Sequence, residues 1–276
     1  MISKKSESVL DVKASSYQME DKKTICLNMI VKNESDIICR CLGSLKWLID
    51  YWVIVDTGST DGTQNIIKEF MIDVPGELHE RPWINFAHNR NESLQLAKSK
   101  CDYVLVIDAD ESLVFAKDFQ LPKLDKDYYQ IISLNSGTIY PRVQLINSKL
   151  NWQWIGVLHE GLFCPQAKSF GELPSVINQI FWDGNRSKDP LKYKKDADVL
   201  EAALKKEPVN SRYVFYLAQS YRDCGEKQAA LKNYQKRVVM GGSHEEVFWS
   251  LNEAAKLKDQ LMMPFDGRIP IFWVAA

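Results

Sequence analysis

The sequence predicts an α/β fold, with a mostly parallel sheet that carries helices on both faces and an α-helical region after it. Up to Glu111, apolar β-branched runs alternate with segments of helical periodicity, which is the order of a parallel sheet with helical crossovers. After residue 190 the chain is rich in Lys, Glu and Ala, with apolar residues at helical spacing. We therefore expect a flexible leader at 1–23, a sheet domain at 24–188 and a helical region at 189–276.

The composition is that of an ordinary globular protein. Of the 276 residues, 45% are hydrophobic and 26% are charged, which is enough apolar material for a sizeable core. The net charge of -1 argues against a broad basic surface for nucleic acid. The six cysteines are scattered, and the N-terminus lacks the apolar core of a signal peptide. We expect reduced cysteines and a cytoplasmic protein, with peripheral attachment to the inner membrane face as an alternative.

The individual elements follow from periodicity. Strands are expected at 25–31, 52–55, 77–80 and 103–107. Helices are expected at 36–48, through Ile66, Ile67 and Phe70, and at 86–98. Further extended segments at 128–134, 138–146, 152–158 and 176–182 predict a partly antiparallel layer that flanks the sheet.

The helical region carries a pattern typical of tetratricopeptide repeats. A shift of about 34 residues, the length of such a repeat, maps Leu200 onto Tyr234 and Phe248 onto Val214. One full repeat between two half repeats is predicted, with an ordinary helical hairpin as the alternative. Such helix pairs cannot bury their apolar faces singly, so we expect them to lean on the sheet domain. The apolar tail at 262–273 is expected either to dock on the body or to belong to a longer array.

Carboxylates follow the ends of several predicted strands. Glu34 lies just after the first strand, Asp56 ends the second, and Asp108 and Asp110 end the fourth. The carboxyl ends of parallel strands share one edge of a sheet, so these side chains can line one crevice. Two close carboxylates suit a divalent ion that also holds phosphate oxygens. The pattern favours a crevice for a nucleoside diphosphate sugar, where such an ion stabilises the leaving group and a base accepts the acceptor proton.

Four sequence blocks in this order resemble a known family. The blocks are Cys26–Glu34, Val53–Thr63, Phe86–Asn91 and Val106–Glu111. Together they resemble the family 2 glycosyltransferases, which have the Rossmann-like GT-A fold. The resemblance covers about residues 24–240 and extends to bacterial members that carry tetratricopeptide repeats after the transferase domain. It implies an inverting, hexosyltransferase-like enzyme.

The resemblance implies a nucleotide site. Asn33 and Glu34 would border the nucleotide, Asp56 would hold the base or ribose, and Asp61 would close the same loop. Arg90 would reach the pyrophosphate or hold the Asp-x-Asp loop in place. Plainer interpretations remain open. Asp56 is also suited to capping a helix, Arg90 to a solvated helix face, and Asp61 to a turn.

The resemblance also implies a metal and a base. Asp108 and Asp110 would bind Mn2+ or Mg2+ with the diphosphate, and Asp110 is the better candidate for direct contact. His159 would be a third metal ligand or would contact a phosphate, and Glu160 would be the general base. The alternative is a strand end with a partly exposed His and Glu. One departure is Trp182, which stands where relatives often have a His before Asp-Gly.

We therefore expect a glycosyltransferase whose donor is a nucleotide-sugar, a UDP-sugar in the first place. A saccharide, a lipid-linked molecule or a peptide would be the acceptor, and the helical region would position it or form a homodimer. A catalytically degraded binding or scaffold protein is the alternative, which Trp182 favours and the intact Asp108 and Asp110 oppose. A nucleotidyltransferase is disfavoured because the first strand is not followed by a Gly-rich basic loop.

Overall fold

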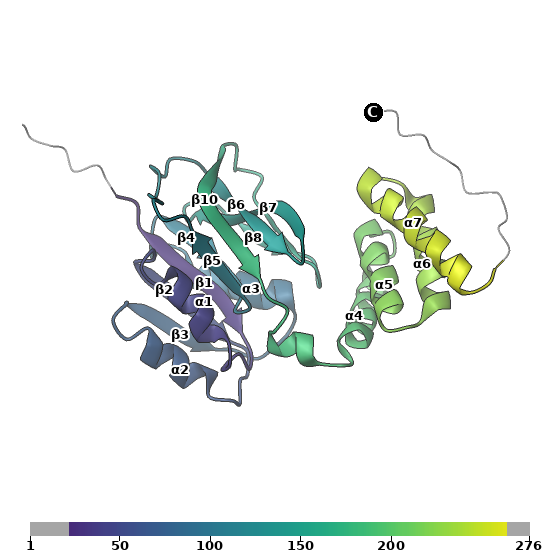
Figure 1. Cartoon of the computed structure of the whole chain (residues 1–276), viewed down its shortest axis with the longest axis horizontal. Coiled ribbons are helices and arrows are strands. Elements are labelled where there is room, and N and C mark those ends of the chain that lie inside the picture. Colours follow the sequence, from purple (N-terminus) through teal and green to yellow (C-terminus); the bar gives the residue numbers. More distant parts are fainter. Residues whose placement is uncertain (1–21, 264–276) are drawn as a thin grey trace, which may run out of the picture.

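The computed structural model describes residues 22–263. The expected leader at 1–23 and the apolar tail at 262–273 therefore lie almost wholly outside the described residues. In Figure 1 the sheet and the helices that cover it form the left part of the molecule, and the helical region forms the right part. The short helix η1 (Asn185–Lys188) joins the two parts.

The larger sheet has eight strands in the order β3-β2-β1-β4-β7-β6-β10-β5. These strands are β1 (Ile25–Val31), β2 (Tyr51–Asp56), β3 (Gly76–Glu80), β4 (Tyr103–Val106), β5 (Glu111–Phe115), β6 (Tyr128–Asn135), β7 (Thr138–Asn147) and β10 (Phe170–Ile180). β1 pairs in parallel with β2 and β4, β2 with β3, and β6 with β10. The mostly parallel mixed sheet confirms the predicted fold class.

The second half of the sheet differs from the sequence prediction. The extended segments beyond residue 120 do not form a flanking layer. Instead β7 pairs antiparallel with both β4 and β6 and so continues the same sheet. Only part of the expected strand at 152–158 forms, as β8 (Gln153–Ile155), which pairs with β9 (Gly161–Phe163) in a separate two-stranded sheet. β5 and β9 were not predicted. The apolar pattern marks extended backbone but does not specify its partner.

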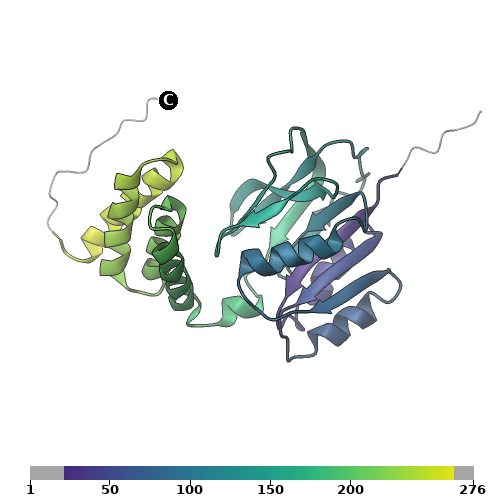
Figure 2. The ribbon, with the colours of Figure 1, turned by 180° about the vertical axis from the view of Figure 1, so that it is seen from behind.

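Helices cover both faces of the sheet, as predicted. These helices are α1 (Ile38–Leu45), α2 (Thr63–Phe70) and α3 (Phe86–Ala97). Ile38 and Leu42 of α1 and Ile67 of α2 lie in one core cluster with Leu27 of β1. Leu94 and Ala97 of α3 lie in another cluster with Cys26 of the same strand. Neighbouring residues of β1 thus face opposite sides, and Figure 2 shows α3 across the face that is hidden in Figure 1.

The helical region consists of four helices that pack in sequence. They are α4 (Lys192–Lys206), α5 (Ser211–Asp223), α6 (Lys227–Met240) and α7 (His244–Gln260). Leu200 and Tyr234, which the repeat pattern makes equivalent, are both fully buried. Phe248 is 63% exposed, although its equivalent Val214 is buried, because within residues 22–263 no helix follows α7. The helix pairing agrees with a repeat, and its assignment as a tetratricopeptide repeat stays a prediction.

The sheet domain packs on the helices through the loop after β8 and through Phe86 of α3. Leu158, from the loop between β8 and β9, is buried in the core of the helical region. Val157 in the same loop donates its backbone N–H to the Tyr213 hydroxyl of α5 at 3.2 Å. None of the helices within residues 22–263 combines the length and apolarity that a membrane span requires.

Candidate active site

The parallel register brings the carboxyl ends of β1 and β2 together. Val31 lies opposite Asp56, and the loops beyond them are bonded to each other. Asn33 adopts a left-handed backbone, and its side-chain oxygen accepts a hydrogen bond from the Thr60 N–H at 2.8 Å. An asparagine tolerates this conformation better than most residues do. Three of the predicted residues, Asn33, Glu34 and Asp56, therefore border the same edge of the sheet.

Asp61 fastens these two loops. Its carboxylate accepts hydrogen bonds from the Ser35 N–H at 3.0 Å and from the Thr63 hydroxyl at 2.6 Å. Although burial raises the pKa of Asp61, the hydrogen bonds from Thr63 and Ser35 lower it to about 2. Asp61 therefore ties the two loops together through contacts within the protein.

Asp56 uses only one of its two oxygens within the protein. The residue is 1% exposed, and Oδ1 accepts the backbone N–H groups of Gly58 at 2.9 Å and Ser59 at 2.8 Å. Oδ2 is buried and has no hydrogen-bond partner among the described residues. Buried acceptors are rarely left unpaired, so this oxygen indicates a donor group of a ligand. The predicted helix-capping role is not seen, because Oδ1 closes the turn at Gly58 and Ser59 and helix α2 has Gly62 at its N-cap without a side-chain hydrogen bond.

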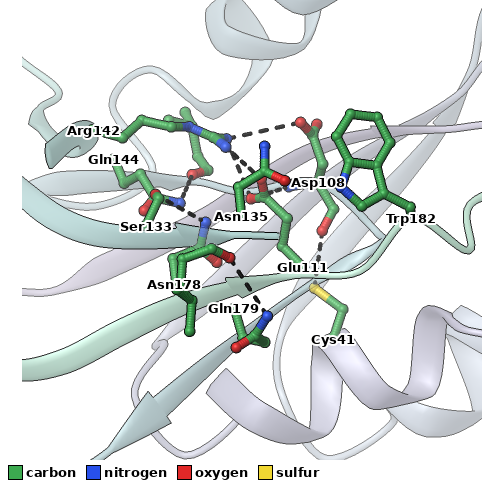
Figure 3. A network of polar contacts seen from close by, with 12 residues as sticks. Cys41, Asp108, Glu111, Ser133, Asn135, Arg142, Gln144, Asn178, Gln179 and Trp182 are labelled. Carbon is green, nitrogen blue, oxygen red and sulfur yellow. Dashed lines mark hydrogen bonds and ion pairs between the residues drawn. The ribbon is translucent and has the colours of Figure 1, made fainter. Parts of the chain in front are cut away.

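Asp108 is held by arginines instead of pointing freely into the crevice. Arg90 is 13% exposed and places Nη2 2.7 Å from Asp108 Oδ1, and its Nε 2.6 Å from Glu160 Oε1. Arg142 lies 3.8 Å from Asp108 Oδ2 and pairs with the buried Glu111, as Figure 3 shows. Although burial raises the pKa of Asp108, the charges of Arg90 and Arg142 hold it below its usual value. Of the two predicted roles for Arg90, the structure contains the one that holds the Asp-x-Asp loop.

Asp110 lies in a turn with a different environment from Asp108. The turn is closed by the Glu111 N–H, which donates to the Asp108 carbonyl at 3.1 Å. Burial, followed by the charges of Asp108 and Glu111, raises the pKa of Asp110 to about 7. Gly184 packs so closely that a Cβ there would lie 3.4 Å from Asp110 Oδ2. Asp110 is therefore enclosed by carboxylates and by the segment that leads into η1.

Glu34 shares this acidic environment. Its Oε2 accepts the Asn185 N–H of η1 at 3.1 Å. Burial raises the pKa of Glu34 to about 7, and the charge of Asp110 adds to this although the Asn185 hydrogen bond opposes it. Glu34 and Asp110 thus repel each other when both are ionised, and a cation between them would relieve that repulsion.

The predicted metal ligands are not gathered into one set. Within residues 22–263, no group of three or more His, Cys, Asp or Glu side chains is placed to hold a metal ion. Asp108 is engaged by Arg90, and the His159 ring stacks on Tyr216 with centroids 3.9 Å apart. Desolvation of the His159 ring, followed by nearby cationic side chains, lowers its pKa to about 4. Only Asp110, with Glu34, remains suited to a hard divalent ion.

Glu160 lies in the loop between β8 and β9, not at a strand end. Its Oε1 accepts from Arg90, and none of the described residues donates to its Oε2. Arg90 therefore connects the predicted base to Asp108, a link that sequence spacing did not reveal because 70 residues separate Arg90 from Glu160.

A clamp beside Trp182, formed by Arg40 and Asp183, was not predicted from the sequence. Arg40 of α1 binds Asp183 through two hydrogen bonds of 2.6 and 2.8 Å. The Trp182 indole N–H donates to the Asn135 side chain at 2.8 Å. Trp182 therefore does not serve as a metal ligand. The two partners in the clamp lie 143 residues apart, so no local pattern marks it.

A mixed sheet of this order, with carboxylates at the carboxyl ends of its parallel strands, is a GT-A fold. Residues 26–128 match the model of the family described as Glycosyl transferase family 2. This match covers all four resembling blocks in full and runs from the second residue of β1 through β5.

Proteins of similar sequence also carry the name glycosyltransferase. The SPbeta prophage-derived glycosyltransferase SunS of Bacillus subtilis is 26% identical over 242 residues, which are 80% of this chain and 55% of that protein. An uncharacterized glycosyltransferase of Rickettsia prowazekii is 24% identical over 266 residues, which are 89% of this chain and 80% of that protein. The chain thus spans about half the length of SunS. Family match and relatives together support a family 2 glycosyltransferase.

Solved structures resemble the chain more distantly. TarS of S. aureus, in complex with UDP-GlcNAc, has a TM-score of 0.46 and 10% sequence identity. The match covers 88% of this chain and 93% of the TarS chain.

Proposed function

We propose that the chain is an inverting glycosyltransferase that moves a sugar from a nucleotide-sugar, a UDP-sugar in the first place, to a saccharide, lipid-linked or peptide acceptor. The observation that carries this proposal is the free, buried Oδ2 of Asp56 at the edge of the sheet where Glu34 and Asp110 also lie. One crevice thereby offers an acceptor for a nucleoside and an acidic site for a metal diphosphate.

The nucleoside would bind at the loops after β1 and β2. The N–H of a uracil ring or a ribose hydroxyl would donate to Asp56 Oδ2 and satisfy the orphaned acceptor. Asn33 and Glu34 border this position, and Asp61 keeps both loops in place. The nucleoside would thus be recognised by groups that the fold has already positioned.

The diphosphate would lie toward Asp110. Asp110 would hold Mn2+ or Mg2+, with Glu34 beside it, because both carboxylates are crowded by like charge and Asp108 is already paired with Arg90. When bound, such an ion neutralises charge on the leaving diphosphate. His159, whose neighbours are cationic, is better suited to its other predicted role, contact with a phosphate.

Glu160 would act as the general base. The acceptor hydroxyl attacks the anomeric carbon, the bond from that carbon to the diphosphate oxygen breaks, and the hydroxyl proton passes to Glu160 Oε2. Oε1 stays bound to Arg90, which fixes the direction of the carboxylate. The acceptor attacks the face of the sugar opposite the leaving diphosphate, so the configuration at the anomeric carbon is inverted.

The helical region would position the acceptor or form a homodimer, as a tetratricopeptide-like array. We keep the cytoplasm, or the inner face of the membrane, as the proposed location. A catalytically degraded scaffold protein is the second candidate, because the Trp182 indole bonds to Asn135 where relatives often have a His. Metal-dependent hydrolysis of a nucleotide-sugar without acceptor separates the two, since a degraded domain gives none.

A thermal-shift screen of nucleotide-sugars with and without Mn2+ tests the proposal. A ligand at about 100 times its dissociation constant stabilises the folded state by about 2.7 kcal/mol, which raises the melting temperature measurably. We expect a UDP-sugar to give this shift with Mn2+, and Asp110→Ala to abolish the part that depends on the metal. If no nucleotide-sugar shifts the melting temperature of the wild type, the proposed function is wrong.

A further inference from the structure

The loop between β8 and β9 is held in place by helix α5 of the helical region. The backbone turns sharply at Gly156, which has a φ of 115°, and again at His159, which has a φ of 52°. Non-glycine residues rarely adopt such a backbone unless their surroundings hold it. The loop, which joins the paired strands β8 and β9, therefore needs support from outside itself.

Two contacts from α5 support the first half of the loop. The Val157 N–H donates to the Tyr213 hydroxyl at 3.2 Å. Leu158 is 4% exposed and lies in the core that α5 shares with the other helices. The backbone just before the strained residue is thus fixed by one hydrogen bond and one buried side chain.

His159 itself is held by two further residues of α5, Tyr216 and Arg212. Its ring stacks on Tyr216 with an interplanar angle of 15° and centroids 3.9 Å apart. Arg212 Nη2 donates to the His159 carbonyl at 3.1 Å, and the guanidinium lies 4.9 Å from the centre of the Tyr216 ring. Ring and backbone of the strained residue are therefore both held by the same helix.

The residue after His159 is Glu160, the proposed base. Glu160 binds Arg90, and Arg90 binds Asp108, so contacts run without a break from α5 to the Asp-x-Asp turn. A shift of the backbone at His159 moves Glu160 with it, because the two are adjacent and a Cβ at Gly156 would lie only 3.3 Å from the Glu160 Cα.

We propose that Tyr216 and Arg212, assisted by Tyr213, are positioning residues for Glu160. The helical region is then a part of the active site, and a ligand that moves α5 alters the placement of the base. This inference rests on the proposed function only for the role of Glu160. The clasp, meaning the contacts of Tyr216 and Arg212 with His159, is a property of the fold and has its own test.

Hydrogen exchange and kinetics of Tyr216→Ala test the inference together. Tyr216→Phe keeps the ring, and Phe248→Ala removes an exposed aromatic residue of α7 as the matched control. We expect amides in residues 157–161 of Tyr216→Ala to exchange roughly tenfold faster or more, as local unfolding becomes easier. We expect kcat to fall by about tenfold to a hundredfold while the donor KM stays within about twofold. UDP-binding stoichiometry should stay at the wild-type value, and Tyr216→Phe should behave as the wild type.

Three outcomes decide the question. If residues 157–161 exchange at the same rate in Tyr216→Ala as in Phe248→Ala, the contacts of α5 do not hold the loop, and the inference is refuted even if kcat has changed. If exchange rises but kcat is unchanged, Glu160 is not positioned for catalysis and its role in the proposed function fails while the clasp stands. Should Tyr216→Ala not fold, Arg212→Gln removes the donor to the His159 carbonyl from a half-exposed side chain and gives the same test.

Discussion

Arg90 Nη2 lies 2.7 Å from Asp108 Oδ1, so the first carboxylate of the Asp-x-Asp pair is neutralised within the protein. The same guanidinium binds Glu160. One cation thus serves two acids from different parts of the chain, and no cation within residues 22–263 is hydrogen-bonded to Asp110, the second carboxylate of the pair.

Replacing this cation should destabilise the protein. In Arg90→Met, Glu160 loses its cation and Asp108 keeps only Arg142 at 3.8 Å, and breaking a buried pair in this way costs about 3 kcal/mol. The free energy of unfolding from urea titration measures the loss. The control is Arg81→Met, whose partner Glu92 lies in a half-exposed pair, and it should cost about 1 kcal/mol or less. Equal losses in the two variants would contradict the buried network.

Asp56→Asn should separate ligand binding from loop structure. The asparagine oxygen can still accept from Gly58 and Ser59, but its amide group can no longer accept a donor at the Oδ2 position. UDP affinity should fall by about tenfold to a hundredfold, and the melting temperature should change little. Isothermal titration and thermal unfolding measure the two quantities. Unchanged UDP affinity would show that Oδ2 faces no ligand.

Asp61→Asn should behave in the opposite way. Its oxygens accept from Ser35 and Thr63, and an amide cannot accept at both sites. The hydrogen bonds that lower the pKa of Asp61 to about 2 stabilise the folded state above the unfolded pKa, and that stability is lost as pH falls toward 2. The variant should therefore be less stable than the wild type at pH 7, and the difference should shrink at pH 3. A constant difference between these pH values would contradict the assignment.

Much of the fold follows from local patterns. The run from Ile25 and the run from Tyr103 predict buried strands because both faces are apolar, and the structure buries both. The insertion of β7 between β4 and β6 does not follow, since it depends on pairing Tyr103 with Asn147, and the alternation within each strand does not select that partner.

The site is predictable in its position but not in its contacts. Parallel topology places Asp56 and Asp108 at one edge, as the sequence indicates. Asp108 and Asp110 were expected to bind one ion together because a single residue separates them. β4 ends at Val106, so both residues lie in a turn, where strand geometry does not set the directions of their side chains. The arginine partners come from distant segments and leave no local signal.

Glu34 should make stability depend on pH. Its pKa rises from 4.5 to about 7 in the folded state, so the folded protein binds more protons than the unfolded chain between these values. The contribution of Glu34 is therefore greatest below pH 4.5 and is lost as pH rises through 7. Glu34→Gln keeps an acceptor for Asn185 and should flatten the decline between pH 5 and pH 7.5, as measured by urea unfolding with EDTA present. An unaltered slope would contradict the burial of an ionisable group here.

Glu160→Gln should abolish turnover without loss of structure. The amide oxygen can still accept from Arg90, so the network to Asp108 stays largely in place, but the side chain can no longer take a proton. General base catalysis contributes about a hundredfold to ten-thousandfold, and kcat should fall by that factor while UDP affinity stays at the wild-type value. Single-turnover kinetics with a UDP-sugar and Mn2+ measure the chemical step directly. Glu92→Gln, in the partly exposed pair with Arg81, is the matched control and should retain full activity. If Glu160→Gln turns over as fast as this control, another group accepts the proton, and Glu160 serves only to hold Arg90.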